Sequence, residues 1–232
     1  MTYGLQFLAL LVGVVVVANV LARRRQAARE TITTDFARQR GLVPVGDENP
    51  LLGAYQALPP APGVGLSGPR PHVLEAIASG RGVVRNALRG RTPAGEVLVL
   101  DHRMPPEGGG NHANPFATWA AFRVPGVPTF HLFPRPRFAV GLKLVELDGA
   151  AGFSRRFALR PADEGEVRRS FTPTVLAACE ALPARKEWQI SAGGDWVLVT
   201  FGLAAQGDLG VLLEASERVA AALQGAALAA LD

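Results

Sequence analysis

The sequence has a single cysteine, Cys179, among 232 residues. One cysteine excludes an intrachain disulfide and any zinc site built from several cysteines. Lysine is almost as scarce, since Lys143 and Lys186 are the only two, so nearly all of the positive charge is arginine. The formal net charge of +4 favours anionic partners without choosing among lipid, nucleic acid and acidic protein.

Charge of either sign is absent from the N-terminal run 4–22, where Gln6 and Asn19 are the only strongly polar residues. As a helix rising about 1.5 Å per residue, this run would span about 28 Å, close to the thickness of the hydrocarbon core of a bilayer. A helix in the core of a water-soluble domain is rarely apolar on every face for so long. The sequence therefore predicts a transmembrane helix within residues 1–22.

A cleaved export signal is the alternative for the same segment, because Val20–Ala22 has the small-residue spacing that a signal peptidase accepts. The charges oppose it, because the residues before the apolar run carry no Lys or Arg and the arginines come after it. Positive charge tends to stay in the cytoplasm. We therefore expect a retained anchor in the bacterial inner membrane, with the N-terminus outside and the rest of the chain cytoplasmic. The flanking basic residues, which also form a candidate site for anionic lipid headgroups, are Arg23, Arg24, Arg25 and Arg29.

A basic juxtamembrane helix is predicted over residues 23–41. Ile32 and Phe36 are i, i+4 neighbours and would share one helix face. Gly41 suits the C′ position that ends a helix, with Leu42 as the apolar residue that follows it. The run TITT is poor helix sequence and leaves a break within this helix open.

Residues 42–232 have the composition of one soluble domain. It begins with a loop rich in Pro and Gly over residues 57–71. Alternating apolar and polar residues then predict an antiparallel hairpin and two further strands. These strands cover residues 81–90, 96–103, 116–124 and 129–133.

The second half of this domain contains most of the predicted helices. A strand over 153–159 precedes a short helix over 162–171 and a second helix that Thr172 caps, with Pro173 in its first turn. A hairpin over 187–201 and an amphipathic helix over 208–225 follow. Strands first and helices later predict an α+β domain, with a largely antiparallel sheet and helices packed on one face.

The C-terminal third resembles a stretch of uncharacterised bacterial membrane-associated proteins. The resemblance lies in the segment FSRRFALRPADEGEVRRSFTPTVLAACEAL and the short hairpin after it. It implies one or two membrane helices and a cytoplasmic domain of unknown function, and it implies no catalytic residues. The positions that carry it are Phe153, Phe157, Asp163, Glu166, Arg168, Thr172, Pro173 and Leu176.

A glycine pattern in residues 63–68, GVGLSG, matches the G-x-G-x-x-G of dinucleotide-binding loops. That pattern binds a pyrophosphate only between a strand and a helix. Here prolines lie on both sides and prevent a helix from starting. We therefore predict no nucleotide, and no other cofactor.

The segment DHRMPPEGGGNHANP gathers side chains that bind metals or move protons. Its candidate ligands or acid–base groups are Asp101, His102, Glu107 and His112. Adjacent residues of a regular strand point to opposite faces, which argues against Asp101 and His102 serving one site. The alternative is an ordinary polar hairpin loop.

A second candidate site is a row of arginines, Arg81, Arg85 and Arg89, that shares a strand face with Val83 and Ala87 if the alternation is regular. Such a row would bind anions, and the alternative is a solvated sheet face. The sequence has neither a nucleic-acid-binding motif nor interleaved exposed aromatic residues. We therefore expect no specific nucleic-acid partner.

These features favour a non-enzymatic interaction or scaffold protein, held at the cytoplasmic face of the membrane by one helix. Its expected partners are the lipid bilayer, anionic headgroups or a protein of a membrane complex. One alternative is a metal-dependent or hydrolytic enzyme that uses the loop of Asp101, His102 and His112. A second alternative is an exported envelope protein.

Overall fold

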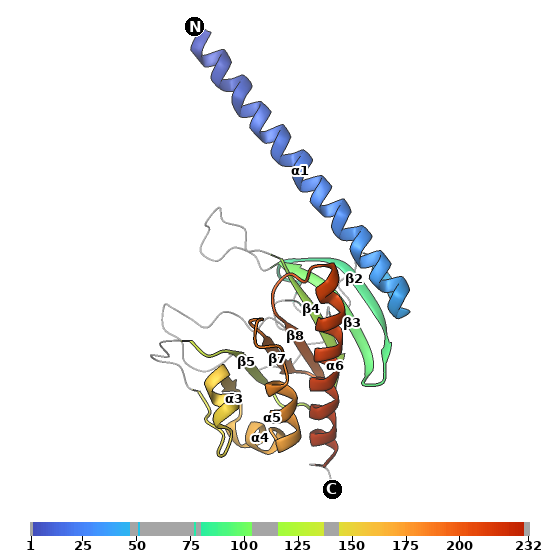
Figure 1. The fold of residues 1–232 in the computed structure, drawn as a ribbon, viewed down its shortest axis with the longest axis vertical. Coiled ribbons are helices and arrows are strands. Elements are labelled where there is room, and N and C mark those ends of the chain that lie inside the picture. The colour runs from blue at the N-terminus through green and yellow to red at the C-terminus, as the bar shows by residue number, and fades with distance from the viewer. Residues whose placement is uncertain are drawn as a thin grey trace.

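The computed structural model of the protein describes residues 2–46, 51, 77, 80–103, 116–136 and 144–229. Figure 1 shows a long N-terminal helix that meets a domain of strands and shorter helices. The helices are α1 (Thr2–Arg40), α3 (Ala151–Arg156), α4 (Glu164–Ser170), α5 (Pro173–Glu180) and α6 (Gln206–Ala229). The strands are β1 (Val43–Gly46), β2 (Val83–Thr92), β3 (Gly95–Arg103), β4 (Ala117–Arg123), β5 (Phe130–Pro134), β6 (Phe157–Pro161), β7 (Gln189–Gly193) and β8 (Trp196–Thr200).

The strands form one eight-stranded sheet in the order β1-β2-β3-β4-β8-β7-β5-β6. Every pair in it is antiparallel. The predicted hairpins are present as β2–β3 and β7–β8, whose alternating apolar residues face the two sides of the sheet. The α+β class and the antiparallel sheet are thereby confirmed.

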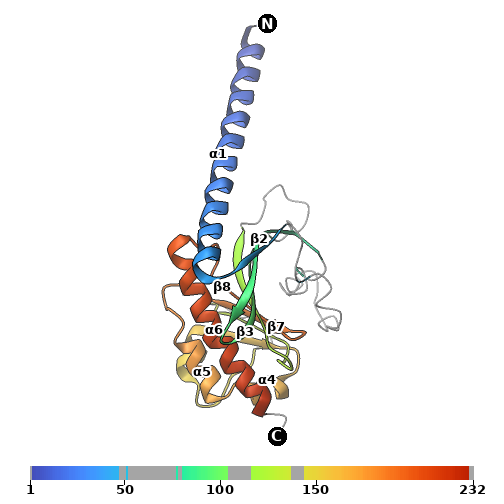
Figure 2. The ribbon, with the colours of Figure 1, turned by 90° about the vertical axis from the view of Figure 1, so that its right-hand side faces the viewer.

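One face of the sheet carries the helices and the larger core, as Figure 2 shows. Side chains from α1, α3, α4, α5 and α6 share one buried cluster with β2–β8. From the helices it includes Phe36, Phe153, Val167, Val175 and Leu212. The C-terminal part of α1 is therefore a component of the domain core, because removing it would expose apolar surface.

The opposite face of the β2-β3-β4-β8 half carries a second, smaller core. Leu98, Leu100 and Trp119 lie in it, together with the fully buried side chains of Leu51 and Ile77. The chain between β1 and β2 thus contributes to the covering of this face. The predicted loop over 57–71 and the glycine pattern within it lie outside the described residues.

α1 runs without a break through the TITT segment. The threonine hydroxyls bond to backbone oxygens one turn back, from Thr31 to Ala27 at 3.0 Å and from Thr33 to Arg29 at 3.0 Å. The helix then ends as predicted: Gly41 has a φ of 65°, and the Leu42 amide donates to the Ala37 carbonyl at 2.9 Å. This 6→1 bond is that of a Schellman motif, and the buried Leu42 completes it.

In the described part of the chain, no helix combines the length and the hydropathy that crossing a membrane requires. The structure therefore does not support the predicted transmembrane helix of residues 1–22.

The predicted strand over 153–159 is wrong in its first half. Residues Ala151–Arg156 form α3, and β6 begins at Phe157. Phe153 and Phe157 both reach the core, with ring centroids 5.5 Å apart. A spacing of four residues puts two side chains on the same side of either a strand or a helix, so this pattern did not distinguish the two.

The other helix starts agree with the sequence. Asp163 caps α4 by accepting from the Glu166 amide at 2.8 Å. Thr172 caps α5, and Pro173 occupies its first turn. Both caps supply a side-chain oxygen to an amide that has no partner within the helix.

Candidate functional site: a polar network between α1 and the sheet

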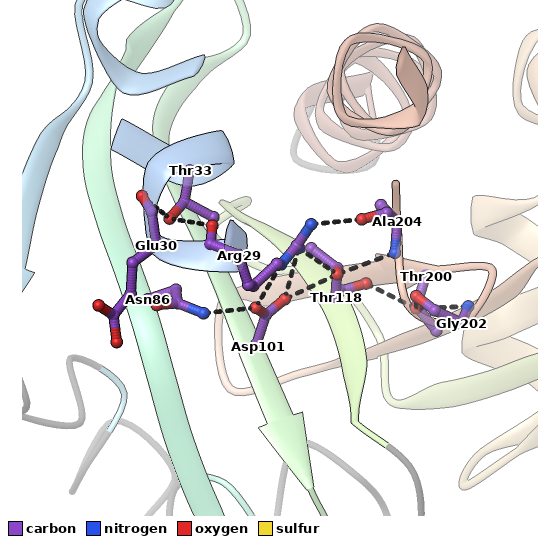
Figure 3. A network of polar contacts seen from close by, with 9 residues as sticks. All are labelled: Arg29, Glu30, Thr33, Asn86, Asp101, Thr118, Thr200, Gly202 and Ala204. Carbon is purple, nitrogen blue, oxygen red and sulfur yellow. Dashed lines mark hydrogen bonds and ion pairs between the residues drawn. The ribbon is translucent and has the colours of Figure 1, made fainter. Parts of the chain in front are cut away.

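A buried ion pair joins α1 to the C-terminal part of β3. Arg29 Nε lies 2.8 Å from Asp101 Oδ2, and Arg29 Nη2 lies 2.8 Å from Asp101 Oδ1 (Figure 3). The side chains are only 12% and 3% exposed. The two parallel contacts form the bidentate fork that makes Arg–carboxylate pairs strong and directional.

The remaining contacts of the pair come from separate elements (Figure 3). Asn86 of β2 donates to Asp101 Oδ2 at 2.8 Å, and Thr118 of β4 donates to Asp101 Oδ1 at 2.7 Å. Arg29 also donates to Thr118 Oγ1 at 2.9 Å and to the carbonyl of Ala204. The Ala204 amide in turn donates to Thr118 Oγ1 at 3.0 Å.

Thr200 extends the network into the turn after β8. Its hydroxyl donates to the Thr118 carbonyl at 2.6 Å and accepts from the Gly202 amide at 3.1 Å. Ala204 lies just before α6, so the network connects α1, the four neighbouring strands β2, β3, β4 and β8, and the segment that leads into α6. Each oxygen of Asp101 accepts two hydrogen bonds, which compensates much of the cost of burying its charge.

A β-bulge puts Asn86 in reach of Asp101. The β2–β3 register shifts between Arg85 and Leu88, and Asn86 has a φ of 52°. Asn tolerates this left-handed conformation better than most residues. The bulge lets Leu88 pack in the larger core and Ala87 in the smaller one.

The same bulge separates the predicted row of arginines. Arg85 pairs with Asp101 and Arg89 pairs with Leu98, and these partners point to opposite faces because they are three residues apart. The prediction that Arg81, Arg85 and Arg89 share one face is therefore wrong. Arg89 binds Glu96, with Nε 2.8 Å from Oε1.

His102 lies next to Asp101 but faces the smaller core, as the strand geometry predicted. Its Nε2 lies 3.0 Å from the Arg81 carbonyl oxygen, to which it donates. Its Nδ1 is buried and has no hydrogen-bond partner among the residues that the structure describes. Burial lowers the pKa of His102, and the bond to the Arg81 carbonyl partly opposes that shift. A methyl group on Gly82, whose φ is 93°, would lie 2.7 Å from His102 Nε2, so a glycine is needed at this turn.

The candidate metal or acid–base cluster is thus divided between two faces of the sheet. Glu107 and His112 lie outside the described residues. Within the described ranges, no three His, Cys, Asp or Glu side chains come together to hold a metal ion. The network around Asp101 has its charged atoms occupied by protein partners, which suits a structural join and offers no free base.

The four arginines after the apolar run do not form one surface. Arg23, Arg24 and Arg25 are exposed on α1, whereas Arg29 turns inward to Asp101. The sequence reasoning missed this role. A signal was present, because Arg29 stands one turn before Thr33 and two turns before Phe36, both of which are buried.

We expect Asp101→Leu to lower the free energy of unfolding by about 3–5 kcal/mol, because it leaves Arg29, Asn86 and Thr118 without their common acceptor. Arg29→Met/Asp101→Leu should cost less than the sum of its single changes, because each single change leaves one buried charge unpaired and the double change leaves none. Urea unfolding of the full chain measures this cycle. The control is Arg40→Ala/Glu214→Ala, a pair whose side chains are 41% and 58% exposed and whose loss should change stability by less than about 1 kcal/mol. Additive single effects would show that the pair is uncoupled.

The stability of the protein should also fall as the pH drops below about 6.5, because His102 takes up a proton more readily unfolded than folded. The stabilisation from a neutral His102 is fully present above the pKa that this histidine has in the unfolded chain. It is lost as the pH falls toward the lower pKa of the folded protein. Its slope is at most about 1.4 kcal/mol per pH unit. His102→Gln, which keeps a donor for the Arg81 carbonyl, should flatten this slope in urea unfolding between pH 5 and 7.5. An unchanged slope would assign the effect to other groups.

No protein-family model matches the chain, and no curated protein matches it. Among solved structures, the chain is similar to the crystal structure of the mycobacterial trehalose monomycolate transport factor A, TtfA. The similarity covers 84% of this chain and 94% of that chain, with a TM-score of 0.53 and 13% sequence identity. At this identity the likeness is one of fold.

Proposed function

We propose that the protein is a non-enzymatic scaffold tethered to a membrane by the apolar run 4–22. The observation that carries this proposal is the exposure of large apolar side chains along α1. They are Val12, Val14, Val16, Val17, Val20 and Leu21, with exposed fractions from 45% to 63%. Figures 1 and 2 show this part of α1 projecting away from the domain, so the sheet and the other helices do not cover it. An apolar surface of this kind calls for a membrane or a partner.

The orientation that we propose places the domain at the cytoplasmic face of a bacterial inner membrane. Arg23, Arg24 and Arg25 follow the apolar run directly and are exposed. A positive flank of this kind is typically retained in the cytoplasm. The resemblance of the C-terminal third to membrane-associated proteins favours the same placement.

A scaffold must hold its partners in a defined geometry, and the Arg29–Asp101 network supports that role. It joins the helix to four strands and to the segment before α6, so the domain would keep a fixed orientation relative to the anchor. The network has no free base or nucleophile, which favours binding over catalysis.

The process that this scaffold would serve is transport, in a complex with another membrane protein. The support is the similarity in fold to a protein named as a trehalose monomycolate transport factor. We extend to this chain only the general role of a transport-associated factor.

Fusions at Asp232 test the proposed topology. A fluorescent protein should fluoresce there and alkaline phosphatase should be inactive, because the domain would lie in the cytoplasm. Replacing Arg23, Arg24 and Arg25 by Ser and adding three arginines before Gly4 should reverse both results. The matched control is Arg155→Ser/Arg169→Ser/Arg185→Ser, which removes three arginines from within the domain, adds none before Gly4 and should leave both results unchanged. An active phosphatase on the wild-type chain would refute the cytoplasmic placement and favour an exported envelope protein.

A further inference from the structure

Two arginines stack on one aromatic ring at the end of the sheet where β2 begins and β3 ends. The guanidinium carbon of Arg85 lies 5.3 Å from the centre of the Phe116 ring, and that of Arg103 lies 4.9 Å from it. Both distances are in the range of cation–π contacts. A guanidinium that lies over a ring keeps N–H groups at its edge that can donate to a ligand.

Acidic partners of these arginines are lacking within the described ranges of the chain. Arg85 donates to the amide oxygen of Gln26 at 3.3 Å, a weak contact with an uncharged group. Asp101 faces Arg85 across the β2–β3 pair, but its two oxygens are occupied by Arg29, Asn86 and Thr118. Other arginines of the domain do have acidic partners, as in Arg89–Glu96, Arg135–Glu146 and Arg168–Glu164.

The position of this pair relative to α1 indicates what it would meet. Gln26, which contacts Arg85, lies four residues after Ala22, the last residue of the apolar run. That interval is about 6 Å of helix rise. The headgroup layer on each side of a bilayer is about 5–7 Å thick. With residues 4–22 in the hydrocarbon, the arginine side chains would lie at the depth of the lipid phosphates.

We propose that Arg85 and Arg103, stacked on Phe116, bind the phosphodiester groups of anionic lipids. This inference rests on the proposed membrane anchor. A guanidinium recognises phosphate through two parallel hydrogen bonds, and two such groups held on one ring place two positive charges close together. Arg25 precedes Gln26 on α1, is exposed, and adds a positive charge at the same level of the helix.

A lipid surface is favoured over nucleic acid by this placement. Single-stranded nucleic acids bind along grooves in which several aromatic side chains stack on successive bases. Here one ring is already covered by two guanidinium groups, and the site lies beside the proposed anchor.

Native mass spectrometry of the full chain in detergent tests the site. The probe is dioctanoyl phosphatidylglycerol, compared with dioctanoyl phosphatidylcholine, inorganic phosphate and a ten-nucleotide single-stranded DNA. Phosphatidylglycerol should bind in preference to the other three. Arg85→Gln/Arg103→Gln should weaken its binding by about 10- to 30-fold.

The matched control, Arg169→Gln/Arg185→Gln, removes the same charge from exposed positions on α4 and after α5 and should leave the affinity unchanged. An equal loss of phosphatidylglycerol affinity in both variants would show that only the net charge matters, and it would overturn the proposed site. Equal binding of the two lipids, or tighter binding of phosphate or DNA, would also overturn it.

Carbonate extraction of cell membranes separates this inference from the proposed function. Suppose that the wild-type chain stays in the membrane and that Arg85→Gln/Arg103→Gln leaves the preference for phosphatidylglycerol unchanged. That combination would refute the headgroup site alone. A chain that carbonate releases would refute the anchor, and with it the depth argument on which the site rests.

Discussion

The ion pair of Arg29 and Asp101 is the contact on which the arrangement of the molecule depends. A buried charge pair contributes little net stability by itself, because both groups lose their hydration. Its cost is offset only when every remaining hydrogen-bonding position is filled. Here the additional hydrogen-bond partners of the pair come from β2, β4 and the turn after β8. The pair therefore forms properly only when α1 and these elements are all in place, and this couples the position of the helix to the folding of the sheet.

The sheet separates two environments that the sequence places side by side. Asp101 faces α1 and a closed polar network, whereas His102 faces the smaller core and keeps a buried nitrogen without a described partner. Neither group resembles a catalytic base held open to a substrate. Arg85 and Arg103, which have no acidic partner within the described ranges, lie at the end of the sheet nearest the projecting half of α1. The chemistry of this face thus suits attachment and positioning.

Local signals predicted much of this fold. Hairpins follow from alternation and turn residues, and helix ends follow from Asp163, Thr172 and Gly41, because each of these effects acts within a few residues. The sequence predictions fail where contacts between residues far apart in the chain determine the local structure. The spacing of Phe153 and Phe157 suits helix and strand equally, and packing in the core selects a helix up to Arg156. The bulge at Asn86 interrupts an alternation that looks regular in sequence. The partners of Arg29 lie up to 175 positions away, so no local pattern could identify them.

If the ion pair fixes α1 on the sheet, the helix and the domain must move as one body. Spin labels at Ala28→Cys and Ala221→Cys, both exposed positions, would measure this by double electron–electron resonance on the full chain in lipid nanodiscs. Burial raises the pKa of the Cys179 thiol to about 12, so that thiol would not compete for the label. We expect a single narrow distance distribution that broadens when Asp101→Leu is added. A broad distribution with Asp101 in place would contradict a rigid join between the helix and the sheet.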